Sequence, residues 1–466
     1  MTMTMKPKYF LALGLLALGL GSCGESFFEQ YPSNNITEGN FYKTDDDFNQ
    51  GVVACYAKLK TQMSFHLTEI GYRSDENVLE SMAVSTQDRY DIDHFAETPS
   101  NGILSDIWDA WYNGIYRCND VLDHMAGAKI PNYDKYRGEC LFLRSWWYFN
   151  LYRVFGVVPI TRTVVTPAAA KLIPRCTEEE MYTLLTEDLA EAARLLPPTP
   201  GPEKARVANI AAYTLLAKVY LTFGKPAEAK TALEEAMKNT SYGLESTTKK
   251  VFDVGNKMNR EIIFALYYNK TNDNGHGYWY SANTDVLADI NNPTPTFKAI
   301  YDSEKDNRLP LISSYTKIKD NLFAMTKWYD TYDATYTTQV GNDFPHLRYA
   351  DVVLMYAEAL AESGGSLGDA LEWLNKTRTR AGLDELTTDE VKSLAEFRRE
   401  LADERGREFA LEGHRWFDLV RLGLAVDYFR GMGYSLEPHN LIFPIPQNQI
   451  EIVNNPSILW QNPGFN

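Results

Sequence analysis

Hydrophobic residues recur at helical spacing along most of the chain beyond residue 40. Apolar residues three or four positions apart share one face of an α-helix, so this spacing predicts amphipathic helices. Four helices are predicted before residue 200, with these inward-facing residues: Phe48, Val52, Cys55 and Leu59; Ile103, Ile107, Trp111, Ile115, Cys118 and Leu122; Tyr136, Cys140, Leu143, Trp147, Leu151 and Val154; Met181, Leu185, Leu189, Ala192 and Leu196. The pattern therefore predicts a mainly α protein.

Capping residues mark where these helices begin and end. Thr44, followed by three aspartates, predicts the start of the first helix, because its hydroxyl can accept from free backbone N–H groups. Thr177 and Glu180 form a capping box for the fourth helix. Gly156 and Pro159 predict the end of the third helix.

Two later stretches predict helix pairs that pack closely. Within residues 206–238, alanines and leucines flank the turn Gly224-Lys225-Pro226, and a similar pattern after Arg348 is interrupted by Gly364-Gly365. Small residues at fixed spacing let two antiparallel helices approach, and the pattern resembles tetratricopeptide repeats. An ordinary helix hairpin would use the same residues and remains the alternative.

The helical period is lost in residues 61–102 and 239–345, which are rich in Asn, Asp, Thr, Tyr and Gly. Irregular segments of this length are usually functional loops, so they predict a ligand-binding surface with a minor strand at 262–266. The last 30 residues are predicted to be coil. We therefore expect a helical region at 23–238, a loop-rich ligand-binding insertion at 239–345, and a helical region with a coil tail at 346–466.

The first 22 residues have the pattern of a removable signal peptide. Lys6 and Lys8 precede an apolar run from Tyr9 to Leu20, which is too short to span a bilayer comfortably. Cys23 follows directly after small residues and looks like the acylated cysteine of a bacterial lipobox. An ordinary signal peptide with an incidental cysteine is the alternative.

Composition narrows the classes of partner. The chain has 466 residues and a formal charge of −16, and removal of Lys6 and Lys8 makes it more negative by two. Such an acidic protein opposes nucleic-acid binding and adsorption to anionic lipids, so membrane attachment depends on a lipid at Cys23. Neutral solutes such as sugars remain suitable ligands.

The other cysteines give no metal or redox motif. Cys55, Cys118, Cys140 and Cys176 include no C-x-x-C pair, and the first three lie on predicted inward helix faces as small hydrophobic residues. An oxidising compartment would allow disulfides, whose pairing the sequence leaves open. No cofactor is expected: calcium at Asn272-Asp273-Asn274-Gly275 is the alternative to a plain turn, but the full ligand spacing is absent.

Catalytic motifs are missing from the mature chain, which has no phosphate-binding loop, zinc-binding helix or nucleophile elbow. Glu404, Glu408 and Glu412 share one predicted helix face, which suggests either a glycosidase acid–base pair or a structural ion network. Nearby arginines would lower the carboxyl pKa values that catalysis needs raised, which favours the ion network. The nearby arginines are Arg405, Arg407, Arg415 and Arg421.

Aromatic residues in the irregular segments suit a sugar ligand. Flat rings cover the apolar faces of sugars, while amide, carboxyl and guanidinium groups read the hydroxyls. The candidate ligand-binding residues are Tyr72, Arg73, Asp75, Tyr278, Trp279, Tyr280, Trp328 and Tyr329. The alternative is that these aromatic residues pack the loops against the helical body.

Ordered motifs along the mature chain resemble the SusD/RagB family of Bacteroidetes nutrient-binding lipoproteins. The motifs are Phe27-Phe28-Glu29, Asn40-Phe41-Tyr42, Arg348 to Ala359, Leu374 to Leu383, Glu404 to Asp418, Ile442 to Gln447 and Gln461 to Phe465. The resemblance implies a SusD-like helical body with long ligand-binding loops and no catalysis. It also implies a TonB-dependent outer-membrane transporter of the SusC type as partner.

The resemblance does not carry over ligand residues, because these lie in the family's variable loops. We expect a lipid-anchored protein of the outer membrane, exposed at the cell surface, that binds oligosaccharide or polysaccharide and delivers it to the transporter. Gly24-Glu25-Ser26 carries one acidic residue, where surface-exported lipoproteins tend to be more acidic, so retention in the inner leaflet stays open. Two rival functions also stay open: binding of peptides by the same scaffold, and hydrolysis of glycosides by an (α/α) helical body.

Overall fold

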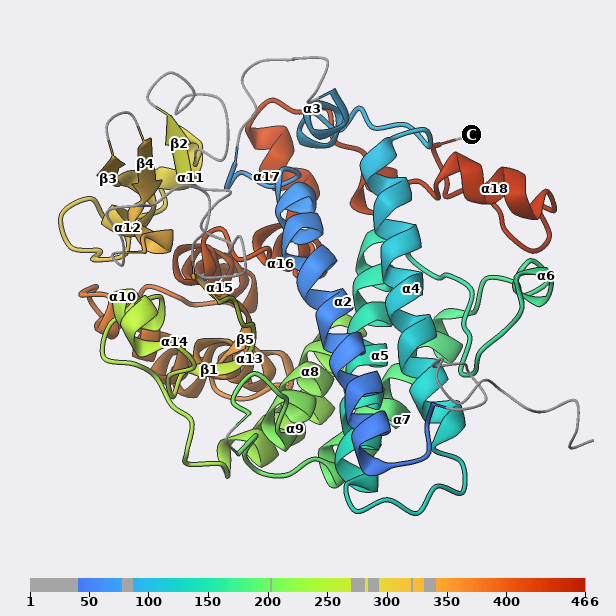
Figure 1. Ribbon diagram of the computed structural model, residues 1–466. Helices are drawn as coiled ribbons and strands as arrows, with labels where there is room; N and C mark the ends of the chain where they lie inside the picture. Colours follow the sequence, from blue (N-terminus) through green and yellow to red (C-terminus); the bar gives the residue numbers. More distant parts are fainter. Residues whose placement is uncertain are drawn as a thin grey trace, which may run out of the picture.

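The computed structural model describes residues 41–77, 87–201, 203–269, 281–283, 293–319, 322–330 and 341–465 (Figure 1). Most of these residues lie in helices, which confirms the predicted mainly α class. Among the described residues, no helix is long and apolar enough to cross a membrane.

Four long helices form the N-terminal side of the molecule: α2 (Asp45–Gly71), α4 (Gly102–His124), α5 (Tyr133–Phe155) and α7 (Glu178–Leu195). The N-terminal cap predicted at Thr44 of α2 and the capping box predicted at Thr177 of α7 are present, and Gly156 ends α5. The inward faces predicted for these helices are buried, and α4 packs against both α2 and α5 (Figure 1).

The two predicted helix pairs are also confirmed. They are α8 (Asn209–Thr222) with α9 (Pro226–Met237), and α13 (Tyr349–Glu362) with α14 (Leu367–Arg380). Gly224 and Gly364, in the two turns, have φ angles of +67° and +83°, a region that glycine enters without a steric penalty. Because α7 packs on α8 and α9 packs on α13, the helices form one continuous row around a shared core.

Two small sheets lie beside this row. β1 (Ile262–Leu266), the predicted strand, pairs antiparallel with β5 (Phe344–Arg348) at the centre of the molecule. The other sheet has the order β2-β4-β3 and lies at the far end of the molecule from α8 and α9 (Figure 1). Its strands are β2 (Ser281–Asn283), β3 (Tyr315–Lys319) and β4 (Leu322–Met325).

Two stretches predicted to be irregular contain more structure than expected. Helix α2 continues to Gly71, where buried His66 and Glu69 interrupt the apolar stripe that the sequence pattern relies on. The stretch expected to be coil after residue 436 contains a short helix near its centre. The remaining helices are α3 (Gln87–Asp93), α6 (Pro167–Ala170), α10 (Thr248–Val251), α11 (Pro295–Lys298), α12 (Leu309–Ser313), α15 (Leu394–Phe409), α16 (Arg415–Arg421), α17 (Ala425–Gly431) and α18 (Gln447–Val453).

The cysteines behave as small hydrophobic residues. Cys55, Cys118 and Cys140 are fully buried in α2, α4 and α5, and Cys176 is buried just before α7. All four are free thiols in the structure. Within the described part of the chain, no group of histidine, cysteine and acidic side chains is arranged to hold a metal ion, and the Asn272–Gly275 turn lies outside it.

Candidate functional site

The turn after α2 holds three of the predicted ligand residues, and all three are buried. Tyr72 caps the end of α2 and is 2% exposed. Arg73 forms an ion pair with Glu97 and donates a hydrogen bond to the Asn440 carbonyl at 2.7 Å. For Tyr72, Arg73 and Asp75, the structure therefore agrees with the alternative expectation that the side chains pack the loop against the body.

Asp75 is held even more tightly than its neighbours. Its carboxylate accepts from the Arg415 guanidinium at 3.0 and 3.2 Å and from the Tyr428 hydroxyl at 2.5 Å. The Thr294 hydroxyl, just before α11, donates to its backbone carbonyl at 2.8 Å. Arg73 and Asp75 therefore fix the turn at residues 72–77 to the C-terminal part of the chain and to the segment before α11.

Trp328 is also inside the protein. Its exposure is 0%, and its ring packs edge-on against Phe252 with the ring centres 5.1 Å apart. Tyr329 is half-buried beside it. Because no face of Trp328 reaches the surface, the predicted stacking of a sugar on this ring does not fit the structure.

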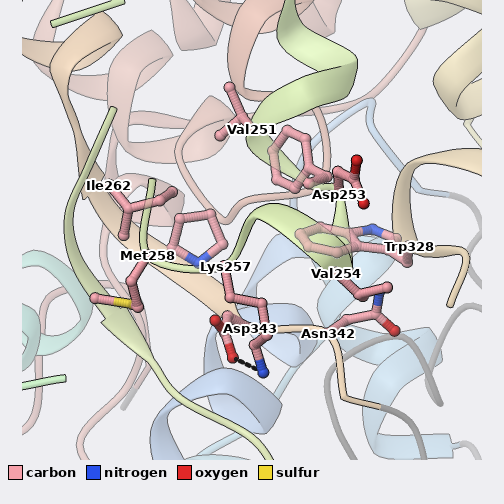
Figure 2. A pocket seen from close by; sticks show the side chains of 11 residues that line it. Val251, Asp253, Val254, Lys257, Met258, Ile262, Trp328, Asn342 and Asp343 are labelled. Carbon is pink, nitrogen blue, oxygen red and sulfur yellow. Dashed lines mark ion pairs between the residues drawn. The ribbon is translucent and has the colours of Figure 1, made fainter. Parts of the chain in front are cut away.

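Figure 2 shows the small cavity next to Trp328, where Lys257 and Asp343 form an ion pair of 2.8 Å. The cavity volume is about 20 Å³. A single water needs roughly 10–15 Å³ on this measure, so the cavity has room for about one water and none for a sugar. Tyr278, Trp279 and Tyr280 lie outside the described residues, and their role stays a prediction.

An open groove lies elsewhere, on the outer side of α4, between it and α6 and α18 (Figure 1). Its volume is about 520 Å³, within the usual range of roughly 300–1,000 Å³ for small-molecule sites. Trp108, Tyr112 and Tyr116 line it at successive turns of α4, which places their rings along one helix face. Tyr116 is 44% exposed and offers its ring to the groove.

Hydrogen bonds fix the walls of this groove. The Gln449 side chain of α18 donates to the Asp109 carboxylate at 3.0 Å, which ties α18 to α4. The Tyr112 hydroxyl donates to the Pro159 carbonyl at 2.7 Å, and Asn119 donates to the Thr161 carbonyl at 3.1 Å. The rings are therefore held by a rigid helix and by a segment that is pinned to that helix.

The groove combines flat rings with groups that can read hydroxyls. Asp109 and Asn113 are exposed next to Tyr112 and Tyr116, and Gln449, which is hydrogen-bonded to Asp109, also lines the groove. The sequence pattern did not reveal this site, because the inward stripe through Trp111 accounted for α4. The sequence does contain a signal for this site. Trp108, Tyr112 and Tyr116 form a second stripe with the same four-residue spacing, each one position after a residue of the inward stripe.

The chain matches two family models. Residues 305–465 match the model described as the SusD family, and residues 29–221 match the model described as starch-binding associating with outer membrane. It is 26% identical to SusD-like protein P2 of Formosa agariphila over 98% of this chain and 100% of that protein.

Solved structures have the same fold. A SusD-like protein of Bacteroides fragilis has a TM-score of 0.78 at 22% identity, covering 93% of this chain and 100% of that one. Surface glycan-binding protein A of Bacteroides thetaiotaomicron, in complex with laminarihexaose, has a TM-score of 0.74 at 22% identity, covering 90% of this chain and 100% of that one. The matched motifs, the helical body and these similarities together show that the chain belongs to the SusD/RagB family.

Proposed function

We propose that the protein is a cell-surface lipoprotein that binds glycans and delivers them to a SusC-like TonB-dependent transporter in the outer membrane. The family and the relatives named as starch-binding or glycan-binding proteins support the ligand class. The signal-peptide pattern that ends at Cys23 supports attachment to a membrane by lipid.

The observation that carries the proposal is the exposed Tyr116 ring in the α4 groove. A sugar stacked on it would have its hydroxyls within the same groove as Asp109, Asn113 and Gln449. A tyrosine ring offers a large flat surface and loses little conformational entropy on binding. These properties suit contact with the apolar face of a sugar. Tyr278, Trp279 and Tyr280 are proposed as a second contact surface, on the composition of their segment alone.

Calorimetry with a panel of oligosaccharides that includes laminarihexaose tests both locations. Loss of a stacking ring costs about 1–3 kcal/mol on the scale known for bases, so Tyr116→Ala is expected to weaken binding by that amount. Trp279→Ala is expected to have a similar effect if its segment contacts the same glycan. Tyr267→Ala is the matched control, because Tyr267 is 43% exposed and lines a different pocket.

Each result assigns a location. A loss confined to Tyr116→Ala places the glycan in the groove, and a loss confined to Trp279→Ala places it on the aromatic segment. If neither variant weakens any glycan that the unchanged protein binds, both placements are wrong. Mass spectrometry of ligands co-purified from native membranes tests the alternative peptide ligand.

Exposed hydrophobic residues around the groove favour a second role for it, the binding of another protein. Seven large hydrophobic residues are exposed among the described residues, and five of them line this groove or adjoin a lining residue in the chain: Tyr116, Val164, Leu172, Ile452 and Trp460. Such clustering is typical of a protein-binding surface. If the transporter docks here, Leu172→Asp is expected to abolish co-purification with it and to leave glycan affinity in solution unchanged, because Leu172 is 71% exposed and does not itself line the groove.

A further inference from the structure

A separate pocket of about 450 Å³ lies between α5, α8, α16 and the coil at residues 441–442. Its lining combines apolar side chains, Phe149, Phe417 and Ile442, with cationic ones, Arg153, Lys218 and Arg421. Its rim is half-exposed at Arg153 and Ile442, so the pocket is open to small molecules. It shares no lining residue with the α4 groove.

Arg153 is the unusual member of this lining. Its guanidinium lies 3.9 Å from the ring centre of Phe417 and 4.7 Å from that of Phe149, and one of its terminal nitrogens donates to the Asn150 side chain. The Nε atom is buried and has no hydrogen-bond partner. Among the described residues, no carboxylate forms an ion pair with Arg153.

The other charged groups around Arg153 form ion pairs with one another. Lys218 pairs with Asp351 at 2.5 Å, and Arg405 bridges Asp351 and Asp418 at 2.9 and 2.7 Å. Arg421 pairs with Asp418 at 2.8 Å and also with Glu358.

In the described part of the chain, the network therefore holds four cations and three carboxylates: Arg153, Lys218, Arg405 and Arg421 against Asp351, Glu358 and Asp418.

Among the described residues, neither of the two further titratable groups of the lining, His414 and Glu178, forms an ion pair with Arg153. His414 lines the pocket, but burial and Lys218 lower its pKa well below the usual range, so it is neutral at pH 7. Glu178 lies exposed at the mouth, where its carboxylate accepts from the Tyr152 hydroxyl at 3.0 Å. Burial lowers the pKa of Arg153 to about 9, against the effect of Asp418 and Asp351, so Arg153 is still protonated at pH 7. Among the described residues, the positive charge of Arg153 therefore has no carboxylate that pairs with it.

We propose that this pocket binds a small organic carboxylate, whose carboxyl group pairs with Arg153 and whose body packs against Phe417 and Ile442. A guanidinium binds a carboxylate through two parallel hydrogen bonds, and Arg153 still has unused donors for this contact. The carboxylate can belong to a free organic acid or to a uronic acid at the end of a glycan.

Calorimetry of the purified protein with benzoate, benzamide and glucuronate tests the proposal. Benzoate and benzamide have nearly the same shape, so a site built around Arg153 is expected to bind benzoate at least about tenfold more tightly, the equivalent of about 1.4 kcal/mol. A stronger response to glucuronate than to benzoate identifies a glycan end group as the source, and the reverse identifies a free acid. Equal binding of benzoate and benzamide, or no binding of either carboxylate at about 50 mM, where even a Kd of a few mM would be detected, overturns the proposal.

Variants test the role of Arg153 itself. Arg153→Gln is expected to lose about tenfold or more in carboxylate affinity, because one charge-assisted contact contributes on the order of 1.5–3 kcal/mol. Arg162→Gln is the control: Arg162 is exposed, pairs with Glu187 at 2.8 Å and does not line the pocket. If Arg153→Gln does not fold, Arg153→Lys keeps the charge without the planar fork and is expected to bind more weakly than the unchanged protein. Unchanged affinity in the folded variant contradicts the assignment.

Discussion

Glu408 lies at the centre of the buried ion network that the sequence pattern favoured over a catalytic pair. It is 1% exposed and pairs with Arg348 at 2.8 Å, Arg380 at 2.5 Å and Arg308 at 3.1 Å. Although burial acts to raise its pKa, these three arginines hold the pKa of Glu408 well below its usual range, and the pKa of Glu404 is lowered too. A glycosidase acid needs a raised pKa, so these two carboxyls are unsuited to that role.

Glu408→Gln is therefore expected to destabilise the fold. The change leaves three buried guanidinium groups without their shared carboxylate, and breaking a buried ion pair from one side costs about 3–5 kcal/mol. Urea unfolding followed by circular dichroism measures the change in the free energy of unfolding. The control is Glu385→Gln, since Glu385 is exposed and its loss is expected to change stability by less than about 0.5 kcal/mol. A Glu408→Gln protein as stable as this control would refute the network's structural role.

The sequence correctly predicted that arginines pair with the glutamates of this helix, but several of the arginines that do so were not the predicted ones. Of the four arginines expected around the glutamates, Arg407 does pair with Glu404 at 3.1 Å, whereas Arg415 pairs with Asp75. The partners that the sequence could not reveal come from other elements: Arg308, Arg348, Arg380 and Lys327. Burial of Trp328 was missed for the same reason, because a ring's exposure depends on what distant segments place over it.

At the scale of elements, the packing of α5 on α4 depends on a glycine. Gly114 of α4 lies under the Trp147 ring of α5, and a Cβ atom added at Gly114 would be 2.2 Å from Trp147 Cε2. Such a contact cannot be relieved without moving the indole, which is fully buried. The glycine therefore sets the spacing between the two helices that carry the core.

Gly114→Ala is expected to destabilise the protein even though alanine is the better helix former. Overpacking a core costs about 1–3 kcal/mol, which exceeds the gain in helix propensity of about 1 kcal/mol. Gly431→Ala in α17 provides the matched comparison, because nothing lies within 4 Å of the added Cβ, and this change is expected to be neutral or mildly stabilising. Equal melting temperatures for the two variants would show that α4 and α5 adjust freely.

Helices could be predicted wherever the sequence showed an apolar stripe at helical spacing or small residues that flank a glycine turn. This held for α2, α4, α5 and α7, and for both helix pairs. It failed at the end of α2, where His66 and Glu69 are polar but buried, and at α6, α12 and α18, which are too short to show a period. The groove along α4 was not predicted from the sequence. A helix with two apolar stripes shows which residues are apolar, but it does not show which of the two stripes other elements leave uncovered in the folded protein.

At the scale of the whole molecule, we propose that membrane attachment and glycan binding depend on different parts of the chain. The signal-peptide pattern ends at Cys23, and the acidic composition opposes adsorption to anionic lipid. Cys23→Ala is therefore expected to move the protein from the membrane fraction to the soluble fraction while glycan affinity of the purified protein is unchanged. Immunoblots of cell fractions together with calorimetry measure both properties. Retention of the variant in membranes would show that another part of the chain attaches the protein.

The contacts that fix the turn at residues 72–77 determine when this end of the molecule can form. Asp75 and Arg415 are 340 positions apart, and Arg73 and Asn440 are 367 positions apart. A chain is synthesised from its N-terminus, so these partners meet only after nearly the whole polypeptide has been made. Closure of the turn therefore comes late in folding, because its long-range contacts must first bring distant segments together. A protein that ends before Arg415 would retain its first helices but leave Asp75 without its partner. Formation of the turn at residues 72–77 therefore depends on the presence of the C-terminal part of the chain.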